Sequence, residues 1–147
     1  MLDELLATVL PGILTAAFGS RLISRWFFVR YSDPQYHLRI RFNGAPRLLI
    51  ADLAPLLADR FDAQLRAGQI WRIQFDTYER EIERYGGMKA IGVAEDLFCA
   101  DSCAALRIMT ALGGDAGLDQ RWRIALLGID AFLTDFGLNL ASKRLAL

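Results

Sequence analysis

The sequence contains very few of the side chains that hold metals or form disulfide bonds. Its 147 residues include 2 cysteines and 1 histidine. A structural zinc site needs four such ligands, and a small secreted scaffold needs several cysteine pairs. We therefore expect neither a bound metal nor a disulfide framework. Cys99 and Cys103 have the spacing of helix-packing residues, and a reducing cytoplasm is the expected location.

An excess of charge of one sign is also lacking. Lysine and arginine number 17, aspartate and glutamate number 17, and the formal net charge is zero. Direct DNA binding needs a surplus of cations to displace counterions, so this balance argues against it. Disorder as the main state is excluded, because 54% of the residues are hydrophobic. The length is that of a single domain, which we expect to cover residues 1–147.

Long apolar runs and common cofactor motifs are missing as well. The longest uncharged run, Leu5–Ser20, has 16 residues, whereas a membrane-spanning helix needs about 20. Asp3 and Glu4 stand near the start of the chain, where a secretion signal has basic residues. The nucleophile-elbow, zinc-protease, dinucleotide-binding and phosphate-loop patterns do not occur. We expect no membrane span, no signal peptide and no cofactor.

The sequence does contain clear hydrophobic periodicity. Spacings of three and four residues predict helices, and strict alternation predicts strands. The predicted elements are a helix over Leu5–Phe18 that Pro11 divides, strands over Arg25–Tyr31 and Tyr36–Phe42, a helix over Pro46–Gly68, a strand over Ile70–Tyr78, and helices over Met88–Leu112 and Leu118–Phe136. This order favours an α+β fold, in which a small, partly antiparallel sheet has helices packed mainly on one face.

Arginine is concentrated around the two predicted neighbouring strands. Residues 21–47 hold six arginines and one acid. Alternation along the second strand puts His37, Arg39 and Arg41 on one face. Neighbouring cations repel each other unless an anion lies between them, so this face is either a solvated surface or an anion-binding site.

Two later segments combine charged and aromatic residues. Tyr78–Gly87 is densely charged and ends in two glycines, which permit unusual backbone angles or a close approach. Glu95–Ser102 places Asp101 and Ser102 on a predicted helix, near Phe98. Each segment is either a solvated, ion-paired surface or part of an ordered site.

Together these segments resemble one family. The stretches WFFVRYSDPQYHLRIRF, DTYEREIERYGG and AEDLFCADS are similar to the C-terminal domain of lantibiotic dehydratases and to the related thiopeptide-type bacteriocin biosynthesis proteins. The resemblance covers Leu2–Leu145. It implies biosynthesis of a ribosomally made, modified peptide, in which glutamate is eliminated from glutamylated serine or threonine to leave dehydroalanine or dehydrobutyrine.

The resemblance also implies candidate site residues. Arg39 or Arg41, together with Glu81 and Arg84, are the implied elimination residues. Guanidiniums suit this chemistry because they stabilise an enolate-like charge and hold a leaving carboxylate. Glu81 either holds the ammonium group of the glutamate or fixes an arginine in place. Substrate binding is expected of Arg30, His37, Tyr85, Asp101 and Ser102.

The sequence departs from the family in one respect. Family domains are longer and carry a late motif with a histidine and an Asn-Arg pair, which this chain lacks, so we expect an incomplete domain. Expected partners are a precursor peptide, a separate glutamyl-transferring subunit and further copies of the chain. Two alternatives stay open: a ring-forming thiopeptide cyclase of the same fold, and a non-catalytic module that binds the precursor peptide.

Overall fold

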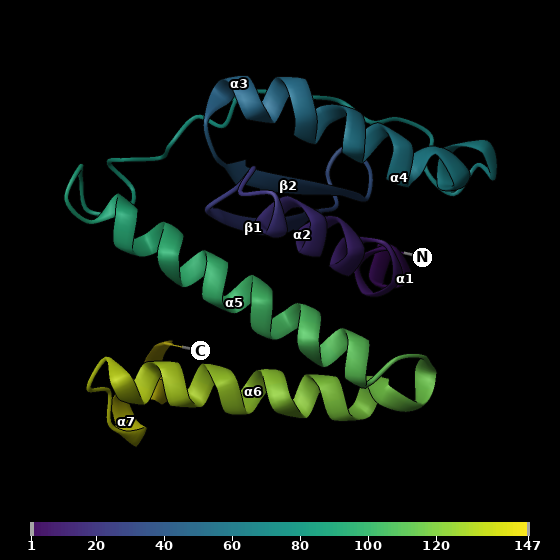
Figure 1. The fold of residues 1–147 in the computed structure, drawn as a ribbon. Helices are drawn as coiled ribbons and strands as arrows, with labels where there is room; N and C mark the ends of the chain where they lie inside the picture. The colour runs from purple at the N-terminus through teal and green to yellow at the C-terminus, as the bar shows by residue number, and fades with distance from the viewer. Residues whose placement is uncertain (1, 147) are drawn as a thin grey trace. The chain divides into compact units, whose positions relative to one another are not determined.

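The computed structural model describes residues 2–146. The chain divides into two compact units, Met1–Arg107 and Ile108–Leu147, which we describe separately. Figure 1 gives the order of the elements along the chain. The α+β class predicted from the sequence is confirmed, and the single domain over 1–147 stays a prediction.

The first unit opens with α1 (Leu2–Thr8) and α2 (Leu10–Gly19), which meet at Val9. Pro11 lies in the first turn of α2, where its missing N–H costs no helical hydrogen bond. The predicted division of the helix near this proline is therefore confirmed. The buried residues of α2, which belong to the core, are Leu10, Ile13, Leu14 and Ala17.

The expectation that no segment is long enough to span a membrane needs a correction. Leu2–Gly19 has 18 residues with a mean hydropathy of 1.4, so its length and composition would allow it to cross one. The uncharged run begins only at Leu5, whereas the helical segment also includes Asp3 and Glu4 and is therefore longer. In this structure Leu6, Leu10 and Ile13 are buried within the first unit, as in a core helix.

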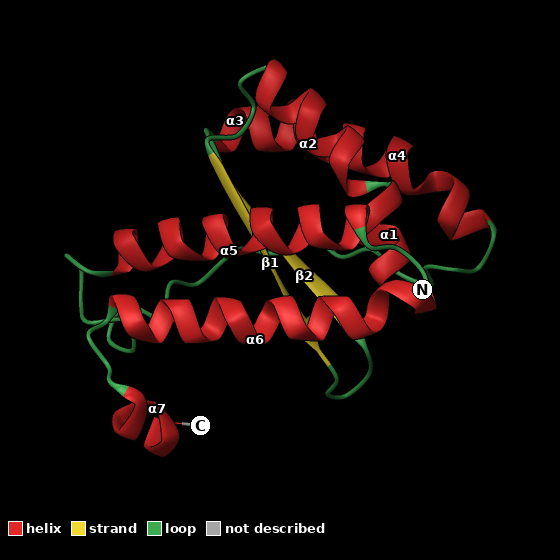
Figure 2. Cartoon of the chain, turned by 90° about the horizontal axis from the view of Figure 1, so that it is seen from below, coloured by secondary structure: helices red, strands yellow, loops and turns green. Residues whose placement is uncertain are grey.

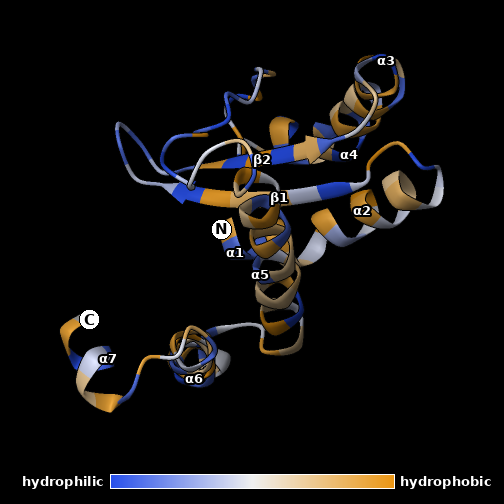
Figure 3. Ribbon diagram, turned by 90° about the vertical axis from the view of Figure 1, so that its left-hand side faces the viewer, coloured by the Kyte–Doolittle hydropathy of each residue, from blue (hydrophilic) through white to orange (hydrophobic). Residues whose placement is uncertain are grey.

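Two antiparallel strands form the sheet: β1 (Arg25–Tyr31) and β2 (His37–Asn43). Figure 2 shows the pair in yellow, and Figure 3 shows polar and apolar residues alternating along β2. Directly paired residues share a face of the sheet. One face, which we call the arginine face, therefore carries Arg25, Phe27, Val29 and Tyr31 of β1 and Asn43, Arg41, Arg39 and His37 of β2.

Helix α5 (Ile91–Ala111) lies against β1. The Phe28 N–H donates a hydrogen bond of 3.1 Å to the Ser102 hydroxyl, and the ring centroids of Phe27 and Phe98 lie 5.3 Å apart. Trp26 and Phe27 point to opposite faces of the strand, and both are buried. Side chains therefore cover both faces of β1 at this point.

The helix predicted over Pro46–Gly68 is a run of three helical parts. These are α3 (Pro46–Leu48), a π-helical turn η1 (Leu49–Leu53) and α4 (Ala54–Arg66). Proline has no N–H, and its ring crowds the carbonyl one turn earlier. The wider turn directly before Pro55 fits this requirement, since it lets the helix continue past the proline.

The strand predicted over Ile70–Tyr78 is wrong. The segment has no regular secondary structure. Polar and apolar residues do alternate along it, but a strand also needs a neighbouring strand with which to form hydrogen bonds. The described sheet contains only β1 and β2. Trp71 and Phe75 are consequently 70% and 60% exposed.

The second unit is helical. A 3₁₀ turn η2 (Asp115–Gly117) leads into α6 (Leu118–Asp135), and α7 (Leu140–Ala146) follows. The Lys143 ammonium lies 2.6 Å from the Asp130 carboxylate and so joins α7 to α6. The helix predicted over Leu118–Phe136 is confirmed by α6.

Candidate functional site

A cavity of about 370 Å³ lies within the first unit, against the arginine face. We call it the site cavity. Strands β1 and β2, the irregular segment before α5, and α5 itself contribute its walls. The lining residues are Phe27, Phe28, Val29, Tyr31, Arg41, Tyr78, Glu81, Arg84, Tyr85, Phe98, Asp101 and Ser102.

Arg41 brings the positive charge of β2 to the site cavity. Its guanidinium lies 5.3 Å from the ring centroid of Phe27 and 4.7 Å from that of Tyr78. The Arg41 Nη1 atom is buried, and no described residue accepts a hydrogen bond from it. The guanidinium forms no ion pair with a described carboxylate, so the part of Arg41 that lines the cavity is suited to an anionic group.

Glu81 and Arg84 form a second charged group in the cavity. The Arg84 Nη1 atom lies 2.9 Å from Glu81 Oε2. The hydrogen bond that Arg84 donates to Glu81 raises the pKa of Arg84, and the charge of Glu81 acts in the same direction. Of the two roles that the sequence left open for Glu81, the geometry favours holding an arginine in place. Gly86 and Gly87 follow with φ values of 82° and 84°, a turn that glycine tolerates best.

Aromatic rings form much of the remaining wall. The Phe98 ring contacts Phe27 at 5.3 Å and Tyr85 at 5.1 Å between centroids, and Tyr78 meets Phe27 edge-on at 5.6 Å. Burial raises the pKa of the Tyr78 hydroxyl, and the nearby Glu95 charge adds to this effect. Apolar walls of this kind lower the local dielectric constant, which strengthens the action of a charged side chain on a ligand.

Asp101 and Ser102 both line the cavity but differ in their contacts. Ser102 is buried, and its hydroxyl oxygen accepts the Phe28 N–H. Its first task is therefore to hold β1 against α5. Asp101 is exposed toward the cavity, and it forms no ion pair with any residue that the structure describes.

His37 and Arg39 lie beside the cavity rather than in its wall. The His37 ring stacks on Tyr31 at 5.2 Å, and the Arg39 guanidinium lies 4.1 Å from the same ring. His37 Nδ1 is 2.8 Å from the Gln35 carbonyl oxygen, and Nε2 accepts a hydrogen bond of 3.2 Å from Arg39 Nε. The sequence left the choice between Arg39 and Arg41 open, and of these two only Arg41 lines the cavity, whereas Arg39 lies over the Tyr31 ring.

Arg30 does not reach the site cavity. It pairs with Asp3 of α1 at 2.8 Å and stands over the Phe28 ring at 5.9 Å. Successive strand residues alternate in direction, so Arg30 projects from the face opposite to Phe27 and Arg41. Its expected role in substrate binding is therefore corrected by strand geometry.

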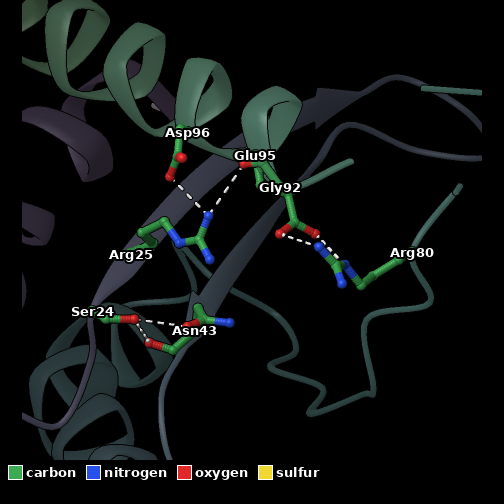
Figure 4. A network of polar contacts seen from close by, with 7 residues as sticks. All are labelled: Ser24, Arg25, Asn43, Arg80, Gly92, Glu95 and Asp96. Carbon is green, nitrogen blue, oxygen red and sulfur yellow. Dashed lines mark hydrogen bonds and ion pairs between the residues drawn. The ribbon is translucent and has the colours of Figure 1, made fainter. Parts of the chain in front are cut away.

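Sequence reasoning missed the groups that support the site. Phe27, Tyr78 and Phe98 form the wall, and Arg80 pairs with the buried Glu95 (Figure 4). Part of this could have been found, because both Tyr78 and Phe98 lie in the segments that carry the family resemblance. The pairing of Arg80 with Glu95 joins residues 15 apart across an irregular segment, and no periodicity predicts that.

The described residues include no cluster of candidate metal ligands. Among residues 2–146, no group of three or more histidine, cysteine, aspartate or glutamate side chains is arranged to hold one. Cys99 and Cys103 are free thiols, and burial raises the pKa of Cys103. The charged residues that line the site cavity are Arg41, Glu81, Arg84 and Asp101.

The geometry thus defines an α+β domain in which a half-buried arginine, Arg41, lines a cavity that also has aromatic walls. Residues 1–147 match the family described as the lantibiotic biosynthesis dehydratase C-terminal domain. The chain belongs to this family.

Individual relatives agree with this assignment. The subtilin biosynthesis protein SpaB of Bacillus subtilis is 45% identical over 78 residues, which cover 53% of this chain and 8% of SpaB. The nisin biosynthesis protein NisB of Lactococcus lactis subsp. lactis is 32% identical over 112 residues, which cover 75% of this chain and 11% of NisB. The chain therefore matches only about a tenth of the length of these relatives.

Two solved structures share the fold. The tRNA dependent lantibiotic dehydratase MibB from Microbispora sp. 107891 superposes with a TM-score of 0.68 at 35% identity, over 74% of this chain and 10% of MibB. TsrL superposes with a TM-score of 0.57 at 21% identity, over 84% of this chain and 34% of TsrL. At that identity the likeness to TsrL shows the fold alone.

Proposed function

We propose that the site cavity eliminates glutamate from a glutamylated serine or threonine of a precursor peptide. In this reaction a base takes the Cα proton, the Cα–H electron pair forms the Cα=Cβ bond, and the Cβ–O bond breaks. The ester oxygen leaves with its electron pair as the carboxylate of glutamate. The product residue is dehydroalanine or dehydrobutyrine.

One observation carries the proposal: Arg41, whose guanidinium forms no ion pair with any described residue, lines the same cavity as Arg84. Elimination develops negative charge at the peptide carbonyl and on the departing carboxylate. Guanidiniums that are fixed before the reaction stabilise such charge without further reorganisation. The Glu81 contact fixes Arg84, and the rings of Phe27 and Tyr78 flank Arg41.

The relatives support the choice of substrate. SpaB and NisB are named for the biosynthesis of subtilin and nisin, and MibB is described as a tRNA dependent lantibiotic dehydratase. Dehydration that depends on tRNA is consistent with an aminoacyl ester on the peptide. Because the chain matches about a tenth of these proteins, we propose that a separate glutamyl-transferring part supplies the glutamylated peptide. A reducing cytoplasm fits the free thiols.

We assign no base among the described residues. Both ring nitrogens of His37 are engaged, one with the Gln35 carbonyl and the other with Arg39. The imidazole therefore positions Arg39 and supports Tyr31. In the proposed reaction the proton acceptor is a group other than His37.

The test supplies a synthetic peptide with a glutamyl ester on serine and follows its mass over time. The proposal expects loss of glutamate, formation of the dehydro residue and dependence on Arg41, with Arg41→Lys more active than Arg41→Ala. Binding of the peptide without any change of mass would instead favour the peptide-binding module. Conversion of a peptide with two dehydroalanines into a six-membered nitrogen ring would favour the ring-forming cyclase.

A further inference from the structure

We propose that Asp101 recognises the free ammonium group of the amino acid that the site cavity releases. The cavity would then select a leaving group that carries an ammonium and a carboxylate at once. This inference rests on the proposed elimination and names the group that decides which acyl adduct is accepted.

Four charged residues line the cavity: Arg41, Glu81, Arg84 and Asp101. Glu81 and Arg84 neutralise each other through their contact of 2.9 Å. Arg41 contacts aromatic rings, and neither Arg41 nor Asp101 forms an ion pair with a described residue. One positive and one negative group therefore remain available to a ligand.

These two groups come from different walls. Arg41 belongs to β2 and Asp101 to α5, and both line the same space. A ligand held by both must present a carboxylate to the guanidinium and a cation to the Asp101 carboxylate. A volume of about 370 Å³ lies near the lower end of the range for small-molecule sites, roughly 300–1,000 Å³.

The position of Asp101 follows from the packing of α5. Phe98 lies one helical turn earlier, and residues three apart project from the same side of a helix. Phe98 packs against Phe27, and the neighbouring Ser102 accepts the Phe28 N–H. These two contacts fix the rotation of α5 about its axis, so Asp101 faces the cavity because of its neighbours.

An amino acid transferred from tRNA is joined through its α-carboxyl group, since that group forms the ester to tRNA. Glutamate esterified in this way keeps its α-ammonium and its side-chain carboxylate. It therefore carries the two charges that Asp101 and Arg41 would pair. A glutaryl ester has the same carboxylate and chain but lacks the ammonium group, which makes it a matched probe.

The experiment measures kcat/KM for a glutamyl ester and for a glutaryl ester of one peptide. Each ester is tested with the parent chain and with Asp101→Asn. The variant should lower kcat/KM for the glutamyl ester by about tenfold to a hundredfold, the range for a charged hydrogen bond. It should leave kcat/KM for the glutaryl ester unchanged. Asp62→Asn serves as the control, because Asp62 pairs with Arg66 within α4, outside the cavity wall.

Calorimetry with free glutamate and free glutarate provides a readout that does not need turnover. The whole chain should bind glutamate more tightly than glutarate, and Asp101→Asn should abolish that difference. An equal loss for both ligands, or for both esters, would overturn the role of Asp101 in ammonium recognition. Absence of elimination together with retained discrimination between the free ligands would overturn the proposed reaction and keep the binding role.

Discussion

Arg80 and Glu95 form an ion pair with two parallel hydrogen bonds. Arg80 Nε donates to Glu95 Oε1 at 2.7 Å, and Nη2 donates to Oε2 at 2.9 Å (Figure 4). Glu95 is buried in α5, whereas Arg80 belongs to a segment without regular structure. Paired bonds of this kind fix orientation as well as distance. They therefore hold the neighbours Tyr78 and Glu81 at the site cavity.

Arg80→Ala should lower both the thermal stability and the elimination activity. The substitution leaves the buried Glu95 carboxylate without its partner, which is strongly unfavourable. Arg80→Lys should recover less than full function, because lysine cannot form both bonds. Thermal denaturation and turnover of the glutamyl peptide measure the two effects. The double exchange Arg80→Glu with Glu95→Arg should restore part of both, and a double variant no better than either single one would contradict the pairing.

Arg84→Ala should make the glutamylated peptide accumulate. The variant removes a fixed positive charge from the cavity wall, and loss of one such stabilising group typically lowers kcat by about 10²–10³. Mass spectrometry of the peptide over time measures the effect. Arg66→Ala is the control, because Arg66 pairs with Asp62 on the exposed surface of α4. Equal rates for Arg84→Ala and the parent chain would remove Arg84 from the site.

Trp26→Ala should destabilise the chain by about 3–5 kcal/mol, the usual cost of removing a large aromatic side chain from a core. Trp26 is 1% exposed, and its ring stacks on Phe28. Trp71→Ala should change the stability by less than about 0.5 kcal/mol, since exposed side chains seldom contribute more. Denaturant unfolding of both variants tests this contrast. Similar losses in the two variants would mean that Trp71 is packed in solution.

Ionisation of the Tyr78 hydroxyl should lower the free energy of unfolding in alkaline solution. Burial raises the pKa of its hydroxyl, so the folded chain holds this proton more tightly than the unfolded chain. The stabilising contribution is complete below the ordinary tyrosine pKa of about 10 and is lost as the pH rises above it. Denaturation should be measured between pH 8 and pH 11, about the range that brackets this pKa. The stability of Tyr78→Phe should decline less over this range than that of the parent chain. Tyr36→Phe, at a residue 80% exposed, should follow the parent curve.

Much of the local structure could be predicted from the sequence. The alternation of His37, Arg39 and Arg41 predicts a strand, and the structure confirms it with β2. The helices around Pro11 and after Gly117 also follow from spacing and from backbone chemistry. These features depend on interactions between residues that are close in the chain, so residue spacing in the sequence predicts them. The charged and aromatic motifs likewise identified the family correctly.

Tertiary packing decided which of these residues form the site. Strand alternation separates Arg30 from Arg41, but only the position of α5 shows which face of the sheet borders the cavity. The alternating segment 70–78 lacks a strand edge to join, so its local pattern yields no strand. The pairing of Arg80 with the buried Glu95, which lies 15 residues later, also depends on contacts in space. Residue spacing in a sequence does not predict hydrogen bonds and ion pairs between distant segments, because these contacts depend on where the folded chain brings the segments together.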